Sequence, residues 1–168
     1  MNSPFAFHVA DLRSGRAEPR DISAEVSVSW KVELSRVMPE PPLRFDFELS
    51  PVGGGIAVIG DIEAVVEHRC HRCLTEWEEE VVRNVGQLIT VAGDDEDADY
   101  LLDGDAYDFE TMIRDELILD LPIAPLCRPD CEGLVDEAGS DLNTDLSEDE
   151  RGENSPFSVL KDLLDTGD

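Results

Sequence analysis

Positive charge is scarce in this sequence. Lysine and arginine together number 13 against 40 aspartates and glutamates, which gives a formal net charge of -27 at pH 7. A charge of this size and sign repels nucleic-acid phosphates and anionic membrane surfaces. Aromatic residues are also few, at 6% of the chain, so little is available for stacking on unpaired bases. The composition disfavours direct RNA or DNA binding, and it fits either a purely solubilising charge or the attraction of a basic partner.

Long apolar runs are absent as well. No segment approaches the roughly 20 apolar residues of a membrane-spanning helix, and Met1–Arg20 lacks the apolar run after a basic start that marks a signal peptide. We therefore expect a cytoplasmic protein without a membrane partner. In that reducing compartment the four cysteines of the chain are expected to be thiols or metal ligands, because disulfides are rare there.

Motifs that specify catalysis are missing too. The histidines His8, His68 and His71 stand without the serine and carboxylate pattern of a nucleophilic triad. The glycines Gly53–Gly55 precede an expected strand and lack the lysine of a phosphate-binding loop. Carboxylates are so numerous that no pair stands out as acid and base. We predict a protein that is not an enzyme. His68 and His71 are expected to be solvated neighbours of a turn, with substitution as metal ligands as the alternative.

Alternation of apolar and polar residues predicts most of the secondary structure. A turn is expected at Gly53–Gly55, and Gly60 suggests a bulge or bend within a strand. Consecutive strands without intervening helices favour an antiparallel meander or a partly closed barrel. The expected strands cover Val26–Leu34, Leu43–Leu49, Ile56–Glu67 and Trp77–Val91.

A single helix is expected after the strands. Residues 93–105 are dense in negative charge and predict an exposed loop. Asp108 is a candidate N-cap for a helix that Pro122 ends, and this helix is expected to cover the sheet. Its apolar positions are Phe109, Met112, Ile113, Leu117 and Leu121. The fold class predicted for residues 1–134 is therefore α+β, with an antiparallel, partly closed sheet or barrel and one covering helix.

The last part of the chain has a different composition. Residues 135–154 are rich in Asp, Glu, Ser and Gly and are expected to form an acidic, disordered linker. Residues 155–168 predict a short amphipathic helix, with Ser155 as N-cap and an apolar stripe that includes Phe157, Leu160 and Leu164. So short a helix is not stable alone. It is expected to dock either on its own domain or, through that stripe, on a partner.

Two cysteine pairs give the most specific chemical prediction. Cys70 and Cys73 are separated by two residues, and Cys127 and Cys131 by three. Such spacings let both thiolates of a pair reach one metal ion, and two pairs supply the four soft ligands of a tetrahedral zinc site. Four sulfur ligands would close the coordination sphere, so the zinc would be structural. The alternative is that these residues are reduced thiols at two turns.

Four short motifs also follow one another in a distinctive order. They are C-x-x-C-L at 70–74, DELILDLP at 115–122, DLN at 141–143 and SPFSVL at 155–160. This order resembles the YceD family of large ribosomal RNA subunit accumulation proteins, from about residue 26 to the C-terminus. The segment 125–134 is similar to the high-GC Gram-positive branch. Many relatives continue with another C-x-x-C-G, where this chain has none.

The resemblance implies a role in the synthesis, processing or stability of large-subunit (23S) ribosomal RNA, without a known catalytic residue. Two hypotheses describe how the protein could fulfil this role. In the first, the acidic surface and C-terminal helix bind a basic ribosomal protein or a large-subunit pre-ribosomal particle. In the second, a zinc knuckle binds single-stranded RNA through Arg69, Arg72 and Arg128, which the surrounding negative charge disfavours.

Overall fold

The computed structural model describes residues 3–13, 15, 17–91 and 98–134. These described residues divide into two units, the first within 3–71 and 75–127 and the second made of 72–74 and 128–134. In the second unit the described residues, 72–74 and 128–134, form turns and irregular backbone. The expected linker over 135–154 and the expected helix over 155–168, with Phe157, Leu160 and Leu164, lie outside the described residues.

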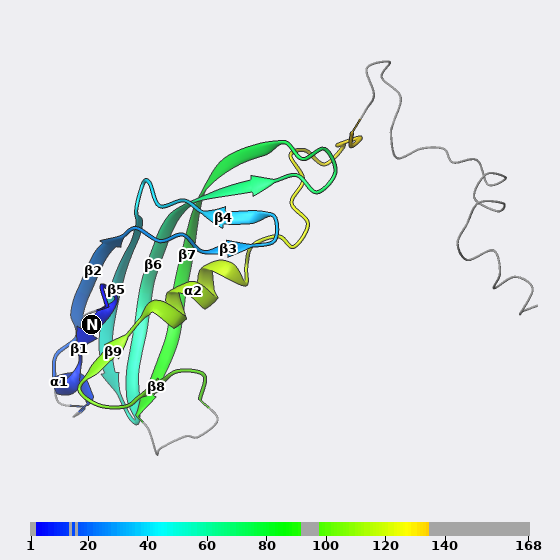
Figure 1. Ribbon diagram of the computed structural model, residues 1–168. Helices are drawn as coiled ribbons and strands as arrows, with labels where there is room; N and C mark the ends of the chain where they lie inside the picture. Colours follow the sequence, from blue (N-terminus) through cyan, green and yellow to red (C-terminus); the bar gives the residue numbers. More distant parts are fainter. Residues whose placement is uncertain (1–2, 14, 16, 92–97, 135–168) are drawn as a thin grey trace, which may run out of the picture. The chain divides into compact units, whose positions relative to one another are not determined.

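The first unit is built on an open β-sheet (Figure 1). Its pairing order is β2-β5-β6-β4-β3, and β7 pairs with β6 on the other side. All described pairs are antiparallel except β7 with β8. The strands are β2 Arg20–Val26, β3 Lys31–Val32, β4 Ser35–Val37, β5 Leu43–Val52, β6 Gly55–Arg69, β7 Glu76–Val91 and β8 Leu101–Leu102.

The sheet does not close into a barrel in the described residues. Closure requires the outermost strands to pair with each other. Strand β2 pairs only with β5, and β7 pairs only with β6 and the short β8. The prediction of an antiparallel sheet is therefore confirmed, whereas its barrel alternative is wrong.

One face of the sheet is buried and the other is exposed. In β5 the residues Leu43, Phe45, Phe47 and Leu49 are buried, while the residues between them are exposed. This is the period of two that the sequence predicted, and each buried Phe or Leu contributes about 1.5–3 kcal/mol by leaving water. We call the exposed side of the sheet the outer face and the buried side the inner face.

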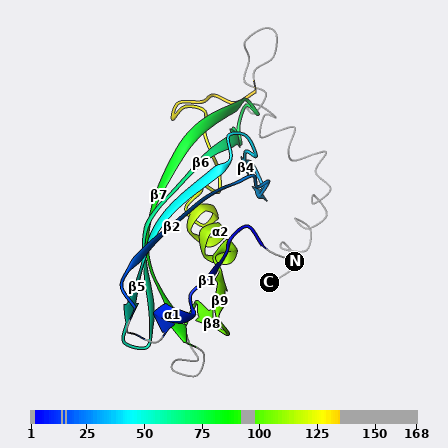
Figure 2. The same cartoon turned by 90° about the vertical axis from the view of Figure 1, so that its left-hand side faces the viewer.

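Helix α2, Glu110–Ile118, packs on the inner face (Figures 1 and 2). It buries Met112, Ile113 and Leu117 against the sheet, as the helical spacing predicted. The carboxylate of Asp108 accepts a hydrogen bond from the amide of Glu110 at 3.0 Å, although Phe109 occupies the N-cap position. The single predicted covering helix is thus present.

A further layer on the inner face comes from the N-terminal residues. Strand β1, Ala6–His8, pairs with β9, Ala106–Asp108, and is followed by the short helix α1, Ala10–Arg13. Their aromatic side chains join those of β5 and the start of α2, with neighbouring ring centroids 5.1–6.0 Å apart. These rings belong to Phe5, Phe7, Phe45, Phe47 and Phe109. Neither β1 nor α1 was expected from the sequence.

Two details of the strand prediction are wrong. The strand expected over Val26–Leu34 is instead the end of β2, a loop and the β3–β4 hairpin, whose turn contains Glu33 at a φ of 38°. Strand β2 ends there because its partner β5 begins opposite Val26. The expected bulge at Gly60 is also absent, since β6 continues through Gly60 in unbroken register with both neighbours.

No helix in the described residues is long and apolar enough to cross a membrane.

Candidate functional site

The first cysteine pair lies in the loop that joins the two longest strands. Strand β6 ends at Arg69, β7 begins at Glu76, and the amide of Cys70 donates a hydrogen bond to the carbonyl of Thr75 at 2.8 Å. Leu74 adopts a φ of 63°, in the left-handed region, which costs a non-glycine residue about 1–2 kcal/mol. The loop is therefore held in a tight conformation by the strands on either side.

The second cysteine pair follows α2 and a proline-rich turn. Within the first unit, the carbonyl of Pro125 accepts a hydrogen bond from the amide of His71 at 3.0 Å, and Nδ1 of His71 lies 3.3 Å from the same oxygen. Within the second unit, the guanidinium of Arg72 donates to the carbonyl of Cys131 at 2.8 Å, and the amide of Cys131 donates to the carbonyl of Arg128 at 3.2 Å. Both pairs thus lie in hydrogen-bonded turns.

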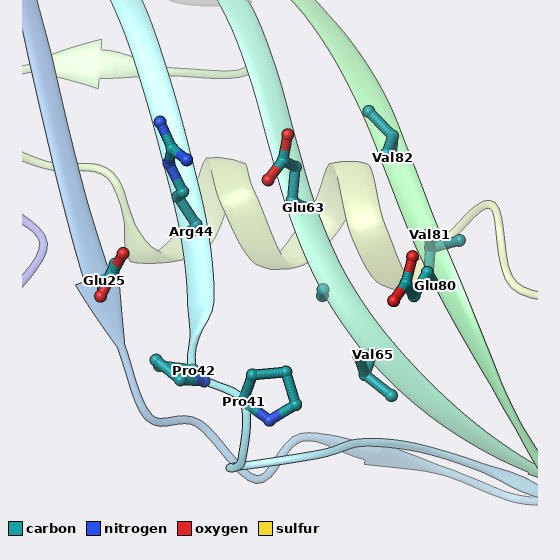
Figure 3. A pocket seen from close by; sticks show the side chains of 10 residues that line it. Glu25, Pro41, Pro42, Arg44, Glu63, Val65, Glu80, Val81 and Val82 are labelled. Atoms are coloured by element: carbon teal, nitrogen blue, oxygen red, sulfur yellow. The ribbon is translucent and has the colours of Figure 1, made fainter.

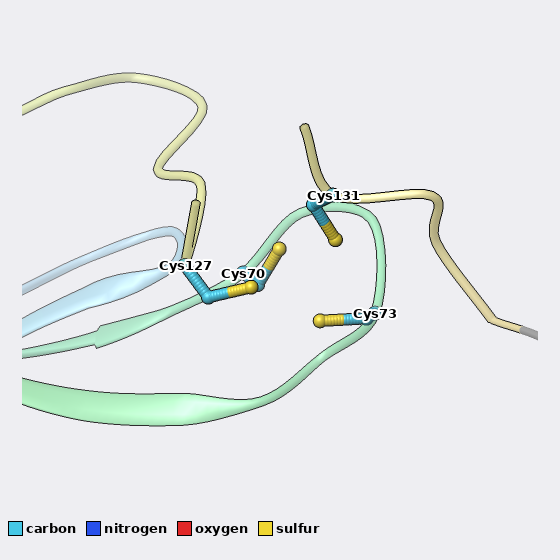
Figure 4. A group of neighbouring side chains, drawn as sticks. All are labelled: Cys70, Cys73, Cys127 and Cys131. Carbon is cyan, nitrogen blue, oxygen red and sulfur yellow. The ribbon is translucent and has the colours of Figure 1, made fainter. Parts of the chain in front are cut away.

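The four sulfur atoms gather at one point. The Sγ atoms of Cys70, Cys73, Cys127 and Cys131 all lie within 4.8 Å of one another (Figure 4). In a tetrahedral site with Zn–S bonds of about 2.3 Å the sulfurs are about 3.8 Å apart, so the observed cluster has the size that such a site needs. Cys70 and Cys131 are buried, and Cys73 is half-buried.

The donor set favours a particular class of metal. Four sulfur ligands suit zinc or an iron–sulfur centre and do not suit magnesium or calcium, which bind oxygen. The residues present therefore fit a thiolate-bound metal, as the spacing of the two pairs predicted. With four protein ligands, no coordination position would be left for substrate, which describes a structural centre and not a catalytic one.

A buried histidine beside this loop was not expected. The side chain of His68 is 2% exposed; its Nδ1 lies 2.8 Å from Oγ of Ser35 on β4, and its Nε2 lies 3.6 Å from the carboxylate of Glu79 on β7. Burial lowers the pKa of His68 below its usual 6.5, with the charge of Glu79 opposing that shift. The expectation of a solvated histidine is wrong for His68. The available signal was its inward phase on β6, two residues after the buried Val66.

The arginines of the RNA hypothesis have different surroundings. Arg69 is exposed at the end of β6, opposite Glu76 in register. Arg72 hydrogen-bonds the backbone of the cysteine turn, as described above, and Nε of Arg128 lies 3.6 Å from the carboxylate of Asp130. Two of the three guanidinium groups thus have protein partners, and contact with RNA stays a prediction.

The fold and the cluster together define an α+β protein: an open antiparallel sheet that carries a four-cysteine candidate metal centre. The chain belongs to the YceD family, because the family model described as "Large ribosomal RNA subunit accumulation protein YceD" matches residues 58–164. The motif order had predicted this family. No solved structure matches the chain.

Mycobacterial proteins are among the curated relatives. An uncharacterized protein of Mycobacterium leprae (strain TN) is 32% identical over 151 residues, which is 83% of this chain and 68% of the relative. Uncharacterized proteins of Mycobacterium bovis and Mycobacterium tuberculosis are 31% identical over 106 residues, 60% of this chain. The chain spans 51% of each of those two relatives.

Proposed function

We propose that this protein supports the accumulation of large-subunit (23S) ribosomal RNA as a non-enzymatic assembly factor that binds a basic ribosomal protein or a basic surface of the large-subunit precursor. Membership of the YceD family supports the part of the proposal that concerns the accumulation of large-subunit ribosomal RNA. The observation that carries the mode of action is the acidity of the outer face. Its acidic residues are Asp21, Glu25, Asp46, Glu48, Asp61, Glu63, Glu67, Glu76, Glu78 and Glu80, and its basic residues are Lys31, Arg36, Arg44 and Arg69.

The carboxylates of the outer face are only partly compensated within the protein. Asp46 lies directly opposite Asp61 in the register of β5 and β6, and Glu67 lies directly opposite Glu78 in that of β6 and β7. Like charges in directly opposed positions of a sheet destabilise it. Arg44 pairs with Asp46 and Arg36 pairs with Glu67, so each opposed pair has one cation for two carboxylates. A basic partner would neutralise the remaining charge, which supports the proposal of such a partner.

Binding of the full chain to purified basic large-subunit ribosomal proteins is expected to weaken steeply with salt. Exposed charges are screened over a Debye length that falls from about 14 Å at 50 mM to about 6 Å at 300 mM salt. The dissociation constant measured by fluorescence anisotropy should therefore rise by at least about tenfold over that range. A flat affinity across the range would exclude an electrostatic mode of binding.

We also propose that the four clustered cysteines hold a structural zinc ion. The support is the convergence of four sulfur atoms within 4.8 Å and the burial of Cys70 and Cys131. Bound zinc would neutralise thiolate charge that otherwise could not be placed so closely, and it would fix the conformation of both loops.

The alternative function is RNA binding through the knuckle, and Arg69 offers the cleanest test of it. Arg69 is exposed, whereas charge reversal at Arg72 would also break its hydrogen bond to the cysteine turn. We expect Arg69→Glu to leave the weak affinity for a single-stranded oligonucleotide within about twofold of wild type at 100 mM salt, since one cation contributes little in a strongly negative field. A tenfold loss in a gel-shift titration, with an unchanged circular dichroism spectrum, would instead favour the RNA module.

A further inference from the structure

The outer face of the sheet is hollowed by a shallow groove of about 560 Å³. Figure 3 looks onto this face, with α2 behind the sheet. The groove crosses β2, β5, β6 and β7. Its lining includes Glu25, Pro42, Glu63, Val65, Glu80 and Val82, together with Arg44. It is thus both acidic and apolar. The core residues Ala64 and Val81 also line it, whereas no residue of the cysteine cluster or of α2 does.

We propose that this groove binds an extended basic segment of a protein partner, with cationic side chains three residues apart and apolar residues between them. The inference rests on the proposed function, because it names the surface and the partner motif through which a basic ribosomal protein would be held. It adds a specific site to what would otherwise be a general attraction between opposite charges.

The groove carries an excess of negative charge. None of the ion pairs formed by the described residues involves Glu25, Glu63 or Glu80. The one basic residue of the lining, Arg44, lies between Glu25 and Glu63 in register and has its Nε 2.9 Å from the carboxylate of Asp46. The three glutamates of the lining therefore outnumber its single cation, which complements a partner segment that carries several cations.

Apolar side chains exclude a simple cation as the occupant. Val82 is 55% exposed, and Val65 and Pro42 line the groove beside it. Further along the outer face, and outside the lining of the groove, Ile59 on β6 is 59% exposed and Leu88 on β7 is 48% exposed. Exposed aliphatic groups that lie together on a sheet face gain free energy when a partner covers them. A peptide that carries both cationic and apolar residues satisfies this requirement, whereas a metal ion does not.

The register of the sheet sets the spacing of the partner's cations. Glu25 lies opposite Arg44, and Arg44 lies opposite Glu63, so the two glutamates are two strands apart. Neighbouring strands are spaced by about 4.8 Å, which puts the two backbone positions about 10 Å apart. An extended chain of the polyproline type repeats its side-chain direction every three residues, at about 9.3 Å. Cations at positions i and i+3 of such a segment therefore match both carboxylates.

The test uses a synthetic nine-residue peptide with three arginines, spaced three residues apart, and valines between them. Its affinity for the full chain is measured by fluorescence anisotropy, against a peptide of the same composition whose arginines are adjacent. The groove variant is the triple substitution Glu25→Gln, Glu63→Gln, Glu80→Gln. The control variant removes the same charge from exposed acidic residues outside the groove, as Glu18→Gln, Asp103→Asn, Asp105→Asn.

The groove variant is expected to bind the spaced peptide at least about tenfold more weakly than wild type, and the control variant less than about threefold more weakly. Val82→Ser, which changes no charge, should weaken binding by about threefold. Thermal unfolding of each variant checks that the fold is retained. Equal losses in the two triple variants, or equal affinity for the two peptides, would overturn the proposal, because binding would then depend only on total charge.

The same variants separate this inference from the proposed function. If the groove variant binds purified basic large-subunit proteins as tightly as the control variant does, the assembly role stands and the groove is not its docking surface. If wild type fails to bind those proteins at all, the assembly role fails, and the peptide titration still decides whether the groove recognises the spaced basic motif.

Discussion

The purified protein is expected to contain one zinc ion per chain, and Cys131→Ser is expected to lose it. Cys131 is 2% exposed and belongs to the sulfur cluster. Structural zinc bound by short peptides contributes about 10–16 kcal/mol at neutral pH, so removal of one of four thiolates should weaken zinc binding by at least about 100-fold. Elemental analysis of protein prepared without chelator or affinity-tag metal measures the zinc content, and a thiol titration counts the reactive cysteines.

Thermal unfolding with and without a chelator, together with a control variant, completes the test for zinc. A chelator should lower the midpoint of thermal unfolding of wild type but leave that of Cys131→Ser unchanged, since metal stabilises only the folded state that binds it. Leu74→Gly is the matched control in the same loop, because glycine accepts the φ of 63° and all four sulfurs remain. This variant should retain zinc. Wild-type protein without zinc and with four reactive thiols would contradict the proposal.

A strand could be predicted from the sequence where one of its faces is buried along the whole length. In β5 every second residue from Leu43 to Leu49 is buried, so the alternation is visible directly. Strand β2 buries only Ile22 and Val26, so its pattern is too sparse to recognise. It forms because it pairs with β5 along its full length. Pairing between segments distant in sequence is not encoded in local periodicity, which explains why an edge strand was missed.

The erroneous strand over Val26–Leu34 has a related cause. Val28 is 8% exposed and Trp30 packs against the core, so apolar residues recur at every second position even though no strand runs through them. A loop that crosses the edge of a core can bury alternate side chains as a strand does. The error therefore concerns backbone pairing and not burial, since both residues do contribute to the core.

The proposed sites likewise include one that could be predicted from the sequence and one that could not. The spacing within each cysteine pair is local information, and two such pairs were enough to predict the cluster. The groove could not be predicted, because Glu25, Glu63 and Glu80 are distant in sequence and come together only through the register of four strands. An acidic composition alone does not distinguish carboxylates that line a docking surface from carboxylates that only increase solubility.

Substitution of Gly60 by alanine is expected to destabilise the protein strongly. Gly60 lies in the middle of β6, paired with Phe47 on one side and Val85 on the other. A Cβ atom at this position would overlap the backbone oxygen of Asp46 on the neighbouring strand. Backbone cannot move aside as a side chain can, so β5 and β6 would have to separate locally. We expect a loss of about 3 kcal/mol or more in the free energy of unfolding, measured by urea titration.

Gly86→Ala on the adjacent strand is the control, and its expected effect has the opposite sign. Gly86 pairs with Ile59 on β6, yet a Cβ atom there would meet nothing within 4 Å. Alanine restricts the unfolded chain more than glycine does, so this substitution should stabilise the sheet by about 0.5–1 kcal/mol. Similar effects of the two substitutions would mean that β5 and β6 do not approach each other at Gly60 as closely as the structure places them.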